Sequence, residues 1–217
     1  MIERLLPDVV ACAEATQDTD DVALFPEEEL SVGRAVDKRR REFITGRACA
    51  RRALTQLGAP VTAIPNGPQG EPLWPAGVVG SITHCAGYRA CAVARADDVI
   101  ALGIDAEPNA ALPDGVFEEV LAPGERGFVA SATDGSGAPD LGRLLFSAKE
   151  AVYKAWFPLM QTWLDFTDAE LSVDLAAATF RARLLVPGPV LNGVQRGEFH
   201  GRWLVEDGII CTAVVVM

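Results

Sequence analysis

The sequence predicts an α+β fold in which one order of elements, a helix followed by three or more strands, occurs twice. Two segments have apolar side chains at the spacing of an amphipathic helix, and short apolar or alternating runs follow each of them. A passage rich in proline, glycine and alanine at 107–115 separates the two halves. We therefore expect an N-terminal lobe of residues 1–110 and a C-terminal lobe of residues 111–217, each a helix packed on an antiparallel sheet.

The first helix is expected at 36–58, because its periodic pattern ends at Gly58 and glycine commonly terminates helices. Extended stretches follow at 77–83, 88–95 and 99–105, with only a few residues between them. Connections this short join antiparallel neighbours. We therefore expect a meander whose first and third strands run in the same direction.

The second half begins with a loop at 131–140, rich in glycine and small polar residues, and a helix from 146 to about 163. Extended runs are expected after this helix, and they lie at 171–175, 180–186, 199–205 and 209–216. The order of elements in this half matches that in the first half.

Composition argues against several classes of protein. A chain of 217 residues that is 49% hydrophobic can bury a substantial core, whereas a net charge of −11 argues against nucleic-acid binding. No stretch approaches the roughly 18 apolar residues of a membrane span, and the charged N-terminus does not resemble a signal peptide. Five cysteines without a C-x-x-C pair favour a reducing cytoplasm.

Two carboxylates end the strand "VIALGID". Asp105 and Glu107 point to the same side, because side chains alternate along a strand. Carboxylates this close repel each other unless a cation lies between them, and Mg²⁺ prefers such hard oxygen ligands. The alternative is a pair of solvated acids at the end of a strand.

His84 ends the first strand of the expected meander, and Asp105 ends the third. Because these strands run in the same direction, both residues should lie at one rim of the sheet. His84 is then either a structural residue or part of a site at that rim.

Arginines are unevenly placed around the first helix. Arg39 and Arg47 fall on the apolar arc, whereas Arg41 and Arg52 point the opposite way. A guanidinium directed at the protein body needs a partner, since an unpaired buried charge is very costly. That partner is either a carboxylate of the chain or a phosphate from outside.

The second helix carries Glu150 and Lys154 nearly opposite its buried stripe. Two structural explanations apply. The segment from Ser147 to Glu150 has the pattern of a capping box, and Glu150 with Lys154 forms an i,i+4 pair.

The spacing of several motifs resembles one enzyme family. "GIDAEP" and, about forty residues later, "FSAKEAVYKAW" resemble the paired signature G-x-D and [FW]-x-x-K-E-x-x-x-K of the 4′-phosphopantetheinyl transferases. "GEPLWP" and "SITH" resemble the family's G-x-P and S-x-(T/S)-H motifs. The ordered set covers about Arg39 to Trp163 and is most similar to the small actinobacterial enzymes related to the enterobactin-synthase transferase.

The resemblance implies two α+β lobes related by a pseudo-twofold, with coenzyme A and Mg²⁺ in the cleft between them. The implied reaction moves 4′-phosphopantetheine from coenzyme A to a serine of an apo acyl or peptidyl carrier protein and releases adenosine 3′,5′-bisphosphate. Such carriers serve fatty-acid, polyketide, nonribosomal-peptide and siderophore synthesis. Because the chain is already a pseudo-dimer, we expect a monomer.

The resemblance also implies roles for individual residues. Asp105, Glu107 and Glu150 would hold the metal, and Glu150 with Lys154 would act in catalysis. The residues expected to bind coenzyme A are Arg39, Arg47, Glu71, Pro72, Thr83, His84, Lys149 and Lys154. One departure concerns Asn66 and Gln69, in a segment where some relatives carry a lysine.

Two alternative functions remain open. A serine hydrolase would use Ser81, His84 and Asp105, although "GVVGSITH" lacks the G-x-S-x-G elbow. A module that binds coenzyme A without turnover is the non-enzymatic alternative, and the acids and lysine of both motifs argue against it.

Overall fold

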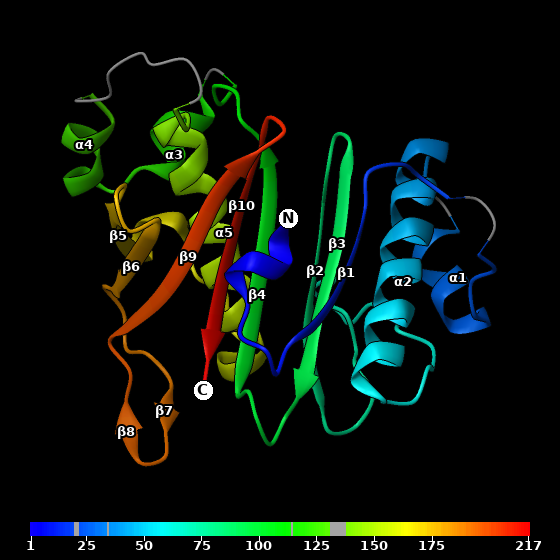
Figure 1. The fold of residues 1–217 in the computed structure, drawn as a ribbon. Coiled ribbons are helices and arrows are strands. Elements are labelled where there is room, and N and C mark those ends of the chain that lie inside the picture. The colour runs from blue at the N-terminus through cyan, green and yellow to red at the C-terminus, as the bar shows by residue number, and fades with distance from the viewer. Residues whose placement is uncertain (20–21, 34, 114, 131–137) are drawn as a thin grey trace.

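The computed structural model describes residues 1–19, 22–33, 35–113, 115–130 and 138–217. Two antiparallel sheets lie side by side in these residues, with the principal helices on their outer sides (Figure 1). The smaller sheet has the strand order β1 (Ala11–Ala15), β3 (Tyr88–Arg95), β2 (Val78–Cys85). The larger sheet has the order β4 (Ala101–Pro108), β10 (Ile209–Val216), β9 (Glu198–Glu206), β6 (Thr179–Leu184), β5 (Ala169–Asp174).

The helices and remaining short elements connect these strands. The α-helices are α1 (Pro26–Val32), α2 (Asp37–Leu57), α3 (Val116–Val120), α4 (Arg126–Ala130) and α5 (Leu141–Met160). Single turns of 3₁₀ helix are η1 (Ile2–Leu5), η2 (Pro123–Glu125) and η3 (Phe166–Asp168), and a small hairpin joins β7 (Val190–Leu191) to β8 (Val194–Gln195). None of the described helices is both long and apolar enough to cross a membrane.

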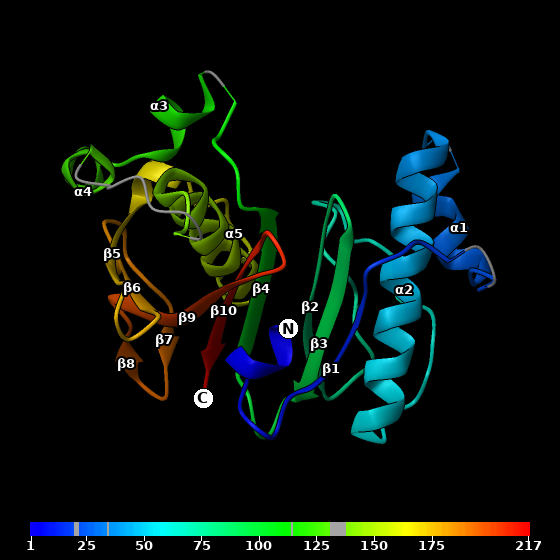
Figure 2. The same ribbon diagram turned by 45° about the horizontal axis from the view of Figure 1, so that its top comes forward.

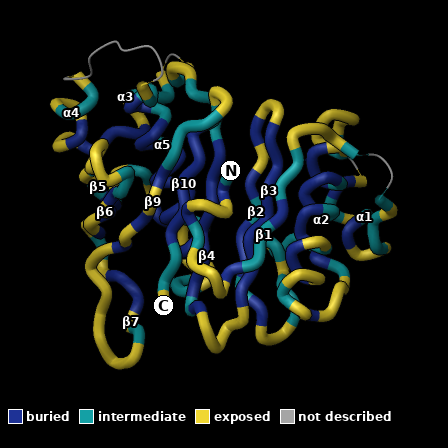
Figure 3. Tube along the Cα trace, viewed as in Figure 1, coloured by how far each residue is buried: buried dark blue, intermediate teal, exposed yellow. Residues whose placement is uncertain are grey.

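The molecule is layered, with α2 on one outer side, the two sheets in the middle and α5 on the other outer side (Figure 2). The alternation of side chains along β3 explains this order. Cys91 and Val93 pack toward α2, whereas Ala90 and Ala92 face a second core that they share with Leu102 of β4. Small residues at these positions allow the two sheets to approach each other, and β3 and β4 are buried along most of their length (Figure 3).

The two long helices begin and end for identifiable reasons. Helix α2 ends where Gly58 adopts the left-handed conformation, with φ of 65°. Helix α5 starts after Asp140, whose side chain accepts a hydrogen bond from the Arg143 amide at 2.8 Å. The capping box expected at Ser147 is therefore wrong, because Ser147 lies two turns inside the helix, where the amides are already bonded.

The predicted meander is also wrong, although its prediction of strand direction is confirmed. Strand β4 forms its ladder with β10 of the larger sheet and not with β3. It still runs beside β2 in the same direction. Side-chain hydroxyls bridge the two strands: Ser81 Oγ accepts from the Ile104 amide and Thr83 Oγ1 accepts from the Ala106 amide, both at 3.0 Å. A short connection does not determine which strand a neighbour pairs with when both faces of that neighbour are apolar.

Most other predicted elements are confirmed within a few residues. Strands β3 and β10 have the predicted bounds, and α5 starts five residues earlier than expected. Strand β1 and helices α1, α3 and α4 were not predicted, because each is short and lacks a full period of apolar residues. Residues 131–137 of the predicted loop lie outside the described residues. The lobe boundary at residue 110 and the pseudo-twofold stay predictions.

Candidate active site

A cavity of about 380 Å³ lies between α2 and α5, at the neighbouring ends of β2 and β4. It brings together most of the site residues expected from the sequence, which are Arg39, Arg47, Pro72, Thr83, His84, Asp105, Glu107, Glu150 and Lys154. We call it the cleft. Glu71 lies in an adjoining cavity of about 490 Å³, which shares Pro72, Glu150 and Lys154 with the cleft.

Asp105 is held rigidly at the centre of the cleft wall and is only 4% exposed. Its Oδ1 accepts hydrogen bonds from Lys154 Nζ at 2.7 Å and from Thr83 Oγ1 at 3.1 Å. Its Oδ2 accepts from Ser147 Oγ at 2.8 Å. Ser147 is itself fixed by Thr212, whose hydroxyl donates to the Ser147 carbonyl at 2.9 Å. The carboxylate is therefore oriented by β2 and α5 at once.

Lys154 points toward β4 and not along its own helix. Besides Asp105, its ammonium donates to the Ile104 carbonyl at 3.2 Å. The described residues thus give Lys154 an ion pair with Asp105 in place of the expected i,i+4 pair with Glu150. The reason is that strand β4 packs directly against α5, so a charge on the strand lies nearer than the next helical turn.

Glu150 and Glu107 both line the cleft together with Asp105. Burial raises the pKa of Glu150, whereas the charge of Lys154 opposes this shift and the charge of Asp105 adds to it. Burial and the Asp105 charge also raise the pKa of Glu107, although Arg143 donates to its Oε2 at 2.8 Å. Arg143 was not predicted, because its link to Glu107 joins positions 36 residues apart in the chain.

These carboxylates have the donor chemistry that a divalent cation needs. They line one cavity, and the charge of Asp105 acts unfavourably on both glutamates, so an added cation would relieve the repulsion. Within the described part of the chain, however, no cluster of three or more acidic, histidine or cysteine side chains has the arrangement of a metal site. Asp105 and Glu107 are instead paired with Lys154 and Arg143.

Arg47 faces the protein body, as predicted, whereas Arg41 and Arg52 are exposed. The same prediction is wrong for Arg39, which lines the cleft but is exposed. The Arg47 Nε donates to the Ile64 carbonyl at 2.7 Å and a terminal nitrogen donates to Asn66 Oδ1 at 2.6 Å. The guanidinium also lies over the Phe43 ring, 4.0 Å from its centroid. Burial lowers the pKa of Arg47 to about 10, so the group stays charged at neutral pH.

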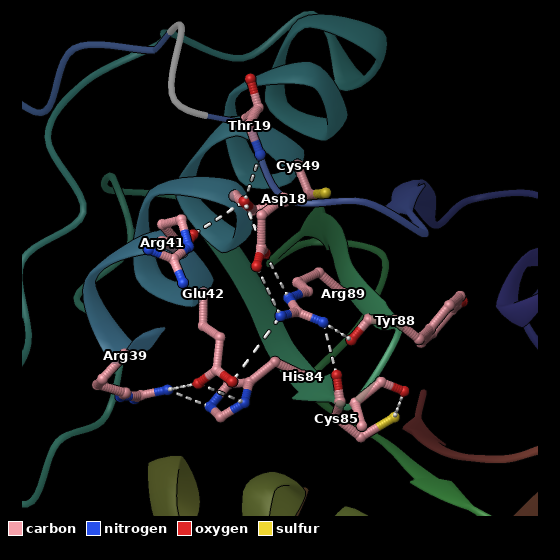
Figure 4. A network of polar contacts seen from close by, with 12 residues as sticks. Asp18, Thr19, Arg39, Arg41, Glu42, Cys49, His84, Cys85, Tyr88 and Arg89 are labelled. Atoms are coloured by element: carbon pink, nitrogen blue, oxygen red, sulfur yellow. Dashed lines mark hydrogen bonds and ion pairs between the residues drawn. The ribbon is translucent and has the colours of Figure 1, made fainter. Parts of the chain in front are cut away.

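Arg39 and His84 also line the cleft, and their side chains lie next to each other (Figure 4). A terminal nitrogen of Arg39 contacts His84 Nε2 directly. Burial, and next the positive charge of Arg39, lower the pKa of His84 to about 4, so the imidazole is neutral at pH 7. Glu42 lies close to both of these side chains. It was not predicted, because its position on α2 does not reveal that it faces Arg89 of β3.

Lys149 is not brought to the cleft. Its side chain is 3% exposed, and the ammonium donates to the carbonyls of Val120 and Phe166 and to the Glu125 carboxylate, at 2.7–2.8 Å. All three of its hydrogens are therefore used inside the C-terminal lobe. The geometry gives Lys149 a structural role and does not favour the predicted contact with coenzyme A.

The residues of the alternative serine hydrolase do not form a triad. Ser81 Oγ accepts from the Ile104 amide and is directed at β4. His84, three residues further along the strand, points to the opposite side, and Asp105 bonds Thr83, Ser147 and Lys154 instead of the imidazole. No nucleophile, base and acid are therefore aligned within these residues.

The chain matches two family models. One describes the 4′-phosphopantetheinyl transferase N-terminal domain and matches residues 27–94, and the other describes the 4′-phosphopantetheinyl transferase superfamily and matches residues 101–208. The second match begins at the first residue of β4.

Three curated relatives resemble the chain over nearly its whole length. The 4′-phosphopantetheinyl transferase Svp of Streptomyces mobaraensis is 52% identical, over 100% of this chain and 89% of its own length. Npt of Nocardia iowensis is 48% identical, over 99% of both chains. PptT of Mycobacterium tuberculosis is 44% identical, over 100% of this chain and 98% of its own. The ordered motifs, the acid-lined cleft and these matches together show that the chain belongs to the 4′-phosphopantetheinyl transferase superfamily.

Proposed function

We propose that this chain transfers 4′-phosphopantetheine from coenzyme A to a serine hydroxyl of an apo acyl or peptidyl carrier protein and releases adenosine 3′,5′-bisphosphate. One observation carries the proposal: a single cleft is lined by acids and Lys154 and also by Arg39 and His84. A ligand that binds both groups of side chains carries a pyrophosphate and a separate phosphate, as coenzyme A does.

Asp105, Glu107 and Glu150 would hold Mg²⁺ when it is bound, and the ion would neutralise the pyrophosphate oxygens as charge develops on them. Thr83 and Ser147 keep the Asp105 carboxylate aimed into the cleft. The Lys154 ammonium, which pairs with Asp105 on the cleft wall, would face the phosphate that is transferred.

The proposed transfer requires alignment of the serine oxygen with the phosphorus and removal of the serine proton. A carrier serine oxygen forms a bond to the β-phosphorus, the bond from that phosphorus to the bridging oxygen breaks, and the nucleotide leaves with the electron pair. Glu150 is suited to receive the serine proton, because burial raises its pKa toward the working pH. Lys154 stabilises the charge on the transferred phosphate.

The adjoining cavity offers room for the pantetheine arm. It is lined partly by apolar and aromatic side chains, among them Leu73, Tyr153 and Phe157, and it reaches Glu150 and Lys154. A chain-like group with a few polar amides fits such a lining. The cysteines are all free thiols, which agrees with the proposed site of action in a reducing cytoplasm, and we propose a monomer.

The test incubates the protein with coenzyme A, Mg²⁺ and a panel of apo carrier proteins and follows the carrier mass. A gain equal to one phosphopantetheine group that needs both coenzyme A and Mg²⁺ supports the proposal. Binding of coenzyme A without transfer to any carrier identifies a non-catalytic module. Covalent labelling of Ser81 by a fluorophosphonate supports the hydrolase instead.

A further inference from the structure

Glu42 places a carboxylate in the end of the cleft where the proposed function puts a phosphate. Its Oε2 lies 3.6 Å from a terminal nitrogen of Arg39 and 3.6 Å from His84 Nδ1. Its Oε1 lies 3.8 Å from Arg89. The side chain is largely buried, so Glu42 is a built part of this site (Figure 4).

Arg89 helps to hold Glu42 in place. Its guanidinium lies 2.9 Å from one oxygen of Asp18 and donates to the other at 3.1 Å. It also donates to the Cys85 carbonyl at 2.6 Å. Held by these groups, Arg89 keeps a positive charge next to Glu42, and Glu42 in turn stays beside the imidazole.

The contact with Arg39 fixes the tautomer of His84. A guanidinium nitrogen can only donate a hydrogen bond, so the Nε2 that Arg39 contacts must accept it. The neutral imidazole therefore carries its one proton on Nδ1. That proton faces Glu42, whose carboxylate can only accept.

A phosphate dianion is likewise an acceptor without protons, so it can bind His84 only through a proton on Nε2. Moving the existing proton from Nδ1 to Nε2 would set an imidazole lone pair against the Glu42 carboxylate, which is unfavourable. Adding a second proton satisfies both neighbours. An imidazolium then donates to Glu42 on one side and to the phosphate on the other.

We propose that binding of the 3′-phosphate of coenzyme A adds one proton to His84, and that Glu42 enforces this uptake because its carboxylate faces Nδ1 at 3.6 Å. The inference rests on the proposed function and adds to it a positioning residue and a coupled proton. Glu42 acts through His84, and the roles of Arg89 and Asp18 are to hold Glu42 in place.

The charges around His84 agree with this change. Arg39 and Glu42 face it from α2, Arg89 from β3 and Lys154 from α5. In the free protein, burial and these cations keep the pKa of His84 at about 4. A phosphate that carries a charge of about −1.5 to −2 would take the place of Arg39 at Nε2 and raise that pKa. Above the second pKa of the phosphate, which is about 6, and below the pKa of His84 in the complex, affinity should fall about tenfold for each unit that pH rises.

The test is titration calorimetry in buffers of different ionisation enthalpy at about pH 7.5, where a free phosphate monoester is almost fully ionised, since its second pKa is about 6. Coenzyme A and 3′-dephospho-coenzyme A share the pyrophosphate, so their difference isolates the 3′-phosphate. We expect more proton uptake with coenzyme A than with 3′-dephospho-coenzyme A, with an excess of at most one proton because a single site is involved. Equal proton numbers for the two ligands overturn the inference.

Glu42→Gln separates the role of the acid from that of the histidine. A carboxamide can donate to Nδ1, so the neutral imidazole can then present its proton to the phosphate from Nε2. We expect the extra proton uptake to disappear in this variant. Retention of the full uptake would contradict the role given to Glu42. The matched control is Glu29→Gln, because Glu29 pairs with Arg40 on the surface of α1 and should leave the uptake unchanged.

A second measurement does not depend on any variant in the site. The chain has two histidines, so the ring nitrogens of His84 and His200 are easily told apart in a ¹⁵N-histidine spectrum with a His200→Gln sample. Coenzyme A should shift the His84 nitrogens to imidazolium values, and 3′-dephospho-coenzyme A should not. A neutral His84 in the coenzyme A complex refutes the inference, whereas failure of coenzyme A to bind refutes the proposed function.

Discussion

Lys154 Nζ lies 2.7 Å from Asp105 Oδ1, which joins the second lysine of the helix motif to the aspartate of the strand motif. The two signatures of the family are thus in direct contact, although 49 residues separate them in the chain. The pair lies on the wall of the cleft that the proposed function assigns to Mg²⁺ and the transferred phosphate.

Lys154→Met should lower kcat by at least ~10²-fold, because one preorganised charge that stabilises the transferred phosphate is lost. The affinity for coenzyme A should fall much less, since the charge matters most in the transition state. Steady-state rates with a saturating carrier check this. An unchanged kcat would leave Lys154 a purely structural partner of Asp105.

The neighbouring Lys149→Met is the matched comparison and should behave differently. It leaves the buried Glu125 without its partner and removes three hydrogen bonds, so the free energy of unfolding should fall by about 3–5 kcal/mol. Denaturant unfolding measures the loss. Full stability with weakened binding of coenzyme A would restore the contact that the sequence predicted for Lys149.

Asp105→Ala and Glu150→Ala should each abolish most Mg²⁺-dependent transfer, whereas Glu107→Ala should be milder, because water can replace an outer ligand. Rates are measured over a range of Mg²⁺ concentrations. Near-normal turnover of either of the first two variants at saturating Mg²⁺ would show that the metal assignment is wrong.

The pH dependence of activity should report the ionisation of the Glu150 carboxylate. Burial raises its pKa, and only the ionised carboxylate can bind a cation or take a proton, so activity should rise with pH through that raised pKa. Glu150→Gln should leave little activity, and the remaining activity should no longer rise with pH in this range. A wild-type profile that stays flat at acidic pH would argue that another group receives the proton.

Arg39→Ala should reduce the preference for coenzyme A over 3′-dephospho-coenzyme A, because this guanidinium is half exposed and can reach a phosphate. Arg47→Ala should reduce the preference too and should also lower stability, since Arg47 holds the loop at Ile64 and Asn66. Affinities of both ligands and the melting temperature are compared with those of Arg41→Ala, an exposed control. Equal affinities of the two ligands in the wild type would contradict both assignments.

Gly103→Ala should disrupt the contact between β4 and α5. A Cβ at this position would lie 1.9 Å from the Ala151 carbonyl oxygen, and backbone atoms on both sides cannot move apart cheaply. We expect a loss of about 3 kcal/mol in the free energy of unfolding. Gly127→Ala, which meets open space, should stay within about 1 kcal/mol of the wild type.

Strand direction and helix periodicity were sufficient to predict where His84, Asp105 and Arg47 lie. Pairing was not predictable in the same way, because β4 is apolar on both faces and the sequence does not say which sheet it joins. The same limit applies to charged partners. Three ion pairs form only when the layers pack, because each joins residues more than twenty positions apart. They are Glu42 with Arg89, Glu107 with Arg143 and Lys149 with Glu125.

The hydroxyl bridge between β2 and β4 restricts how this protein can move. Thr83 links the two sheets through the Ala106 amide and, with the same oxygen, donates to Asp105. Separation of the sheets would therefore release the aspartate and misalign it. We therefore expect transfer to require that β2 and β4 stay together, because only then does Thr83 hold the Asp105 carboxylate in place.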